Sequence, residues 1–155
     1  MAGFEGSDTI EVKGLEQMLK ALKARPPVAR IGILGGKNYR SDQATNAEIG
    51  AAHEFGTSKI PQRSFLRFPL SENLNKYLEK SKLLDNDAMS EVIREGSVKP
   101  WLTKVAIVAK SIVLDAFQSN GFGKWPAWKG HYRSRTGQIL VDSTQLRDSI
   151  DWDIK

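Results

Sequence analysis

The sequence contains no cysteine, only two histidines and no long apolar run. Without cysteine, neither disulfides nor thiolate metal sites can form, and nothing indicates an oxidising compartment. No apolar stretch approaches the roughly 20 residues that a membrane-spanning helix needs. Residues 1–7 are small and polar with an acid at Glu5, unlike a secretory signal peptide. We therefore expect a chain without membrane contact that stays in the cytoplasm until it assembles.

Patterns that carry enzyme chemistry are also missing. His53 and His131 lie far apart, and His53-Glu54 is not followed by a second histidine four residues later, so the zinc-protease pattern is absent. Residues 32–36 lack both the Lys-Ser/Thr ending of a phosphate loop and the spacing of a dinucleotide loop, which favours a tight turn. No nucleophile elbow is present. We predict that the chain is not an enzyme and has no cofactor, and that His53 is a helix residue at the edge of a core or interface.

A cation site is the one metal hypothesis that the sequence offers. Asp85 and Asp87 could supply oxygen ligands. An aspartate just before a helix also caps its free N–H groups, and a cap before Ala88 is the simpler interpretation. We predict no metal site.

The first third of the chain predicts two strands and two helices. Residues 9–13 alternate apolar and polar and predict a strand, whereas residues 28–34 predict a second strand that ends at two glycines. Between them, residues 15–22 carry an apolar helical stripe that Pro26-Pro27 ends. Thr45 and Glu48 form a capping box for a helix over residues 46–55, with Gly56 as its stop. The apolar face of this helix is expected to bury Ile49, Ala52 and Phe55.

The rest of the chain predicts an α+β fold in one domain over residues 1–155, a length that suits a single core. Residues 65–68 predict an apolar cluster of Phe65, Leu66 and Phe68, followed by a helical stripe over residues 70–78 and a polar helix or hinge over residues 85–96. Pro100 opens the longest helix, the expected spine of the core. Ser143 is expected to cap a short helix, and a last strand through Trp152 and Ile154 completes a small antiparallel sheet on the long helix.

Positive charge is concentrated in one stretch. The chain has a net charge of +5, and residues 99–135 hold seven basic residues against one acid, Asp115. Such a stretch can meet DNA or an acidic protein surface, although a solvated helix face followed by a loop is the simpler interpretation. The residues predicted to make such contacts are Lys104, Lys110, Lys124 and Lys129.

Two tryptophans stand out within this basic stretch. Trp125 and Trp128 lie in a segment broken by glycine and proline, near Phe122 and Tyr132. They can fold over the chain's own core, anchor a protein interface or stack on nucleic acid. Residues 37–43 and 121–137 are predicted to be flexible loops, of which residues 39–43 and 123–135 would order against neighbouring proteins.

Three segments carry a resemblance to a known family. Residues 47–56 read AEIGAAHEFG and residues 60–67 read IPQRSFLR, similar to the AxIHEFG…IPxRPFLR signature of phage virion-morphogenesis proteins. Residues 139–150 read ILVDSTQLRDSI, similar to the family segment LxDTGxLRxSI. Trp125 to Trp128 lies where the family often has a W.PL segment. The family includes Mu-like and P2-like tail-completion proteins and siphophage head–tail joining (neck) proteins. Two departures are Ser64 in place of a common proline and Ser143-Thr144 in place of Thr-Gly.

The resemblance implies a structural virion protein in the tail or neck of a tailed phage, as a tail-completion, tail-terminator or head–tail joining subunit. Its partners would be copies of itself in a ring, commonly a hexamer, together with tail-tube and connector proteins, and DNA could pass through the lumen. The motifs do not separate these roles. A basic nucleic-acid-binding module is the alternative. The residues expected at subunit or partner interfaces are Arg63, Arg67, Trp125, Trp128, Asp142 and Arg147.

Overall fold

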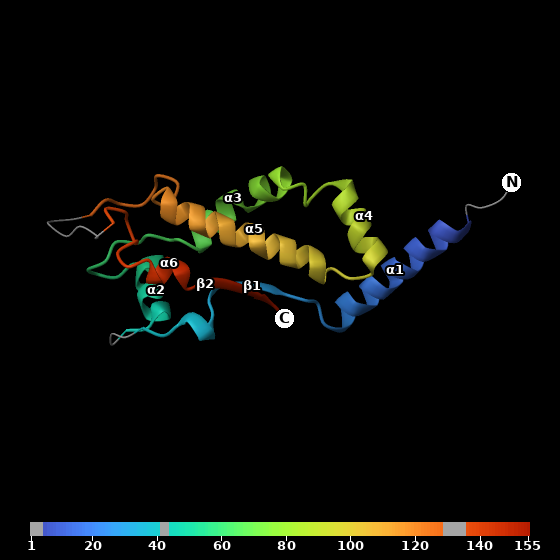
Figure 1. Cartoon of the computed structure of the whole chain (residues 1–155), viewed down its shortest axis with the longest axis horizontal. Helices are drawn as coiled ribbons and strands as arrows, with labels where there is room; N and C mark the ends of the chain where they lie inside the picture. Colours follow the sequence, from blue (N-terminus) through green and yellow to red (C-terminus); the bar gives the residue numbers. More distant parts are fainter. Residues whose placement is uncertain (1–4, 41–43, 129–135) are drawn as a thin grey trace.

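A computed structural model describes residues 5–40, 44–128 and 136–155, with side chains described from residue 12 onward in the first stretch. The molecule is elongated, and its longest central element is a helix (Figure 1). In chain order the elements are α1 (Glu5–Ala24), β1 (Ala29–Ile33), the 3₁₀ turn η1 (Gly35–Lys37), α2 (Asn46–Phe55), α3 (Arg67–Lys80), α4 (Asn86–Glu95), α5 (Lys99–Gln118), α6 (Gln145–Asp148) and β2 (Ile150–Ile154). The expected α+β class is confirmed.

Helix α5 is the spine of the core, as its periodicity predicts. Ile112, Val113, Ala116 and Phe117 follow the helical repeat and are fully buried. Helix α3 packs along α5, and the hydroxyl of Tyr77 donates a hydrogen bond of 2.8 Å to Asp115 between them. The sheet packs against α5 as well. A proline near the first turn of α5 costs no helical hydrogen bond, because that N–H would lack a partner in the helix.

The two-stranded sheet pairs an early segment of the chain, β1, with the last one, β2. β1 and β2 pair antiparallel, with Ile31 opposite Trp152 and Ile33 opposite Ile150. The predicted last strand and the predicted strand over residues 28–34 are therefore confirmed. The strand predicted at residues 9–13 is wrong, because these residues lie inside α1. Five alternating residues are a weak signal, and an adjacent helical stripe extends at low cost once a helix has nucleated.

Helix caps follow the sequence at three places. The Thr45 hydroxyl accepts from the Glu48 N–H at 3.2 Å and the Glu48 carboxylate accepts from the Thr45 N–H at 2.7 Å, which is the predicted capping box. Asp85 accepts from the Ala88 N–H at 3.1 Å, so its role here is a cap. Gly56, at a φ of 75°, ends α2. Ser143 does not cap α6: Thr144 holds that position at a φ of 61° and donates its hydroxyl to Asp148 instead.

Two aromatic residues expected inside are on the surface. Phe55 is 64% exposed and Phe68 is 47% exposed, whereas Phe65 is fully buried. The buried side of α2 instead carries Gly50 and the carboxylate of Glu54. A Cβ at position 50 would lie 2.7 Å from Cδ1 of Ile33, so α2 approaches β1 too closely for a larger residue. The buried face of α2 carries Gly50 and Glu54, so Phe55, one residue after Glu54 and about 100° further round the helix, lies on the exposed side.

Asp151 on β2 ties the sheet to two other elements. Its carboxylate lies 2.9 Å from Nζ of Lys37 in η1 and 3.2 Å from Nζ of Lys110 on α5. The hydrogen bonds from Lys37 and then Lys110 lower the pKa of Asp151 from 3.8 to about 2. The charged form is therefore preferred in the folded state.

Asp151→Asn is expected to lower the stability at pH 7 by at most about 1 kcal/mol, because the ion pairs are open to solvent. The contribution is complete above about pH 4 and is lost as the pH falls towards 2, because the folded pKa lies below the unfolded one. The melting temperatures of the wild type and of Asp151→Asn should therefore converge as the pH falls from 4 to 2. A constant gap over this range would contradict the assignment, and Glu79→Gln on the exposed face of α3 is the control.

Candidate functional site

The carboxylate of Glu54 is buried at the end of α2 and gathers four donors. It accepts hydrogen bonds from the Ser64 hydroxyl at 2.6 Å and from the N–H groups of Phe65, Leu66 and Arg67 at 2.9, 3.0 and 3.1 Å. These N–H groups lie at the start of α3, where a helix leaves donors without internal partners. Leu66, at the N-cap position, supplies no side-chain cap. Glu54 therefore supplies the negative cap of α3 from another helix.

Arg63 holds the other side of the same turn. Its side chain is buried, and it donates from Nε to the carbonyl of Pro126 at 2.9 Å and from Nη2 to the carbonyl of Ala127 at 3.1 Å. Its guanidinium also lies 4.8 Å from the ring centroid of Trp128. The planar fork of arginine suits two parallel acceptors. Arg63 thus works inside the chain, where it fixes the segment that follows α5.

Trp125 belongs to the core. It is 9% exposed, its indole N–H donates to the carbonyl of Ser64 at 2.9 Å, and its ring meets Phe117 edge-on at 5.7 Å. For Trp125, the structure agrees with the first interpretation of the tryptophan pair, a loop that folds over the chain's own core. We call residues 54–67 together with residues 121–128 the junction.

The third segment that carries the family resemblance also reaches the junction. Leu140, Val141 and Leu146 are buried in one cluster with Phe65 and Trp125. Figure 1 shows α2, α6 and the end of α5 together at one end of the molecule. The three segments singled out by the sequence therefore meet in space, although they lie far apart along the chain.

A pocket of about 510 Å³ opens between these segments. Its apolar lining comes from α2, the turn at residues 60–61 and α6, and includes Ile49, Ile60 and Leu146. Among the described residues, its charged lining is Arg40, Lys59, Arg63 and Asp142. The volume falls within the range of about 300–1,000 Å³ usual for ligand pockets.

His53 lines this pocket from α2. Its buried Nδ1 has no hydrogen-bond partner among the described residues. Burial lowers the pKa of His53 below 6.5, and the positive charge of Arg63 lowers it further, so the ring is neutral at pH 7. In the described parts of the chain, no three histidine, aspartate or glutamate side chains gather in a way that could hold a metal ion.

Arg67 forms a cluster on the outer surface of the same turn. Its guanidinium lies 5.2 Å from the ring centroid of Phe55 and 5.0 Å from that of Phe68, and its Nε lies 3.8 Å from the Glu54 carboxylate. All three side chains are exposed. We call Phe55, Arg67 and Phe68 the Arg67 cluster. Exposed aromatic rings with arginine have the composition of interface hot spots.

The other predicted site residues are spread over the molecule. Lys104 pairs with Glu91, Lys110 with Asp151 and Lys124 with Glu72, so each joins a different element. Arg147 pairs with Asp148 at 2.9 Å, and Asp142 lines the pocket. Lys129 and parts of the predicted loop segments, residues 41–43 and 129–135, lie outside the described residues.

Sequence reasoning missed Glu54 and the pocket. A signal for Glu54 was present, since an acid in the last turn of a helix opposes the helix dipole and needs another partner.

Comparisons of the chain with protein-family models, curated proteins and solved structures found no match. No helix among the described residues has both the length and the apolar character to cross a membrane.

Glu54→Ala is expected to destabilise the protein by about 3 kcal/mol, because it leaves the buried donors around position 54 unpaired. The matched control is Glu48→Ala on the exposed side of the same helix, which should cost clearly less, because water replaces the lost capping bond there. Urea unfolding monitored by tryptophan fluorescence measures the loss of unfolding free energy in both variants. Equal losses would show that the buried carboxylate is no more important than an ordinary cap.

Removal of His53 should change the pH dependence of stability. Because its folded pKa lies below 6.5, its contribution is complete above about pH 6.5 and declines as the pH falls. Asn in its place cannot titrate, so the melting temperature of His53→Asn should fall less steeply between pH 7.5 and pH 5 than that of the wild type. His131 is present in both proteins, so the difference isolates His53. If the melting temperatures of the two proteins fall equally steeply with pH, the lowered pKa of His53 is refuted.

Proposed function

We propose that this chain is a structural, non-enzymatic virion subunit of a tailed phage that completes the tail or joins it to the head. It would act in the virion by assembly with copies of itself, commonly as a hexameric ring, and with tail-tube and connector proteins. The observation that carries the proposal is the junction. Glu54, Arg63 and Ser64 lie in the segments that resemble the phage family. Glu54 binds the Ser64 hydroxyl within these segments, and the Arg63 side chain and the Ser64 carbonyl join them to residues 121–128.

The geometry suits assembly better than catalysis. The junction holds its backbone from two sides, so the side chains it displays need little further ordering when a partner binds. The Arg67 cluster is the best-formed of these displayed groups. Two exposed rings and a cation offer apolar area together with a charge that can select its partner.

The alternative, a basic nucleic-acid-binding module, has less support. The three described lysines that it would use are each engaged in an ion pair with a different element. Exposed ion pairs are weak, so phosphates could compete for these lysines, but each lysine charge is already balanced by an acid, which lowers the gain from a phosphate contact. DNA contact fits best as a minor property of an assembled ring.

Loss of the gene is expected to give unjoined heads and tails, or tails of uncontrolled length, in a phage that encodes this chain.

Arg67→Ala should reduce the yield of joined particles at least ten-fold while it changes the melting temperature of the purified protein little, because Arg67 is exposed. Electron microscopy of lysates provides the readout, and Lys76→Ala on α3 is the control. Normally joined particles without the protein would overturn the proposal.

A further inference from the structure

The turn between α3 and α4 is fixed in an unusual way for an exposed corner. The backbone of Lys82 has a φ of 55°, and the following Leu83 is 8% exposed. The carbonyl of Leu83 accepts a 2.8 Å hydrogen bond from the indole N–H of Trp101 on α5. The Asp85 cap then starts α4. The corner is therefore held in place by the spine of the molecule.

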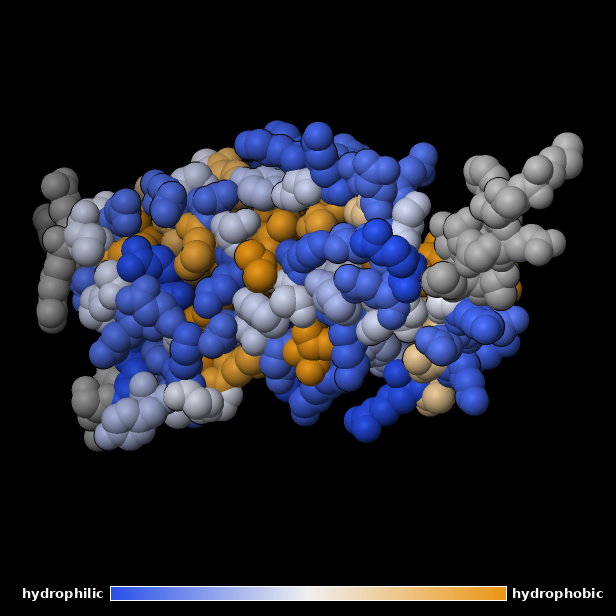
Figure 2. Space-filling view, turned by 45° about the vertical axis from the view of Figure 1, so that its right-hand side comes forward, coloured by the Kyte–Doolittle hydropathy of each residue, from blue (hydrophilic) through white to orange (hydrophobic). Residues whose placement is uncertain are grey.

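This fixed corner displays apolar side chains beside acids. Leu84 is 45% exposed and Met89 is 37% exposed, while Asp85 and Asp87 are exposed next to them. Residues 84–91 contain three acids and no base, of which Glu91 pairs with Lys104, and the exposed Lys82 lies two residues before Leu84. We call Leu84, Asp85, Asp87 and Met89 the acidic corner. On the face shown in Figure 2, hydrophobic surface occurs as separate patches among hydrophilic residues, as expected for local anchors.

The pocket at the junction has the complementary character. Its apolar lining can receive a leucine side chain, and the charged side chains that line it among the described residues are three bases and one acid, with His53 neutral. Lys59, in the exposed turn before Ile60, has no ion-pair partner in the described part of the chain. A bound segment that brings both an apolar anchor and carboxylates would satisfy both features.

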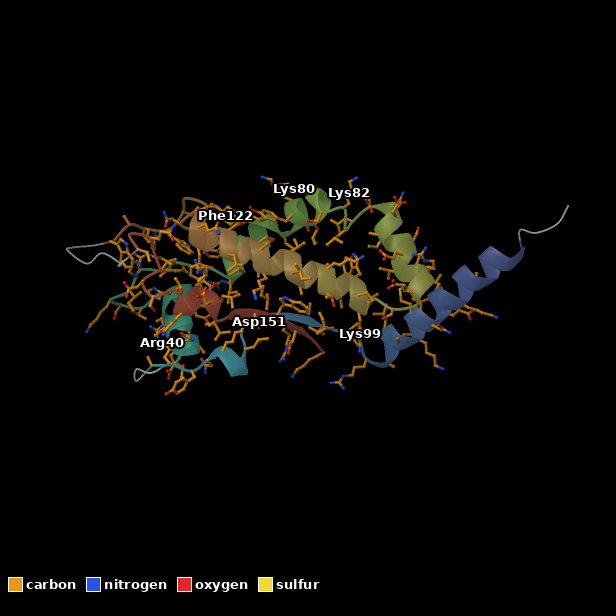
Figure 3. All side chains as sticks on the ribbon, viewed as in Figure 1. Arg40, Lys80, Lys82, Lys99, Phe122 and Asp151 are labelled. Atoms are coloured by element: carbon orange, nitrogen blue, oxygen red, sulfur yellow. The ribbon has the colours of Figure 1, made fainter. Side chains whose placement is uncertain are left out.

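The acidic corner and the pocket lie far apart in one molecule. In Figure 1 the turn between α3 and α4 lies towards α1, whereas α2 and α6 are at the other end. Figure 3 shows the same separation between Lys82, two residues before Leu84, and Arg40, which lines the pocket. A chain therefore cannot place its acidic corner in its own pocket, but a second copy can.

We propose that the acidic corner of one copy binds the pocket of a second copy, with Leu84 on the apolar lining and Asp87 next to Lys59. This head-to-tail contact leaves a free corner and a free pocket on each pair, so it can repeat. The inference rests on the proposed assembly function, because it takes the chain to be a self-associating subunit, and it names the surfaces through which copies meet.

Exchanging the two charges tests the contact. Lys59→Glu places an acid opposite the acidic corner, and Asp87→Lys places a base opposite the pocket, so each variant alone should weaken self-association at low salt at least ten-fold. In an equimolar mixture, each altered surface meets its altered complement and each unaltered surface its unaltered complement. Sedimentation velocity should therefore show that the mixture associates as the wild type does at half the total concentration, because each surface finds its complement on only half of the chains. Lys76→Glu on α3 is the charge control.

A second pair of variants tests the apolar part of the contact. Leu84→Ala should weaken self-association at least ten-fold, whereas Ile107→Ala, which removes a side chain that is 53% exposed on α5, should not change it. Melting temperatures identify any variant that fails to fold. Because Leu84 and Asp87 are exposed and neither caps a helix, both variants should remain folded.

Three results would overturn the inference: a wild type that stays monomeric at all concentrations, a mixture no more associated than its components, or equal effects of Leu84→Ala and Ile107→Ala. Particle assembly separates this failure from failure of the proposed function. If the null mutant leaves heads and tails unjoined while Leu84→Ala joins them normally, the function stands and this contact does not. If the null mutant assembles normally, the function fails whatever the purified protein does.

Discussion

The buried carboxylate of Glu54 is the constraint on which the rest of this structure depends. A charge removed from water is tolerated only where donors surround it, and here the donors are the Ser64 hydroxyl and the N–H groups that begin α3. One side chain therefore sets the position of α3 relative to α2. Since α3 packs along α5, the same contact also places the spine.

Arg63 and Trp125 extend this constraint to the segment after α5. Arg63 is held by two carbonyls and Trp125 by the carbonyl of Ser64, so residues 63–64 exchange hydrogen bonds with residues 125–127. The result is a turn whose inner side chains serve the fold and whose outer side chains, above all those of the Arg67 cluster, are left for contacts. An assembly subunit gains from this division, because a preorganised surface loses less entropy when a neighbour binds.

The sequence predicts the parts of the fold that local chemistry determines. The capping box at Thr45, the cap at Asp85 and the apolar repeat of α5 each depend on neighbouring residues, and each is confirmed. The strand at residues 9–13 and the buried position of Phe55 are wrong because both depend on competing packing: a longer helical stripe in one case and burial of the α2 face that carries Gly50 and Glu54 in the other. The pocket could not be predicted, since its lining comes from segments that only the tertiary fold brings together.

Amide hydrogen exchange of the native protein tests the central role of the junction most directly. If Glu54 and Arg63 hold the turn as described, the amides of Phe65, Leu66, Arg67 and Trp125 should exchange only in openings as rare as those of the buried turns of α5. Exchange of these amides at the fast rate of an exposed loop, with α5 still protected, would contradict the account.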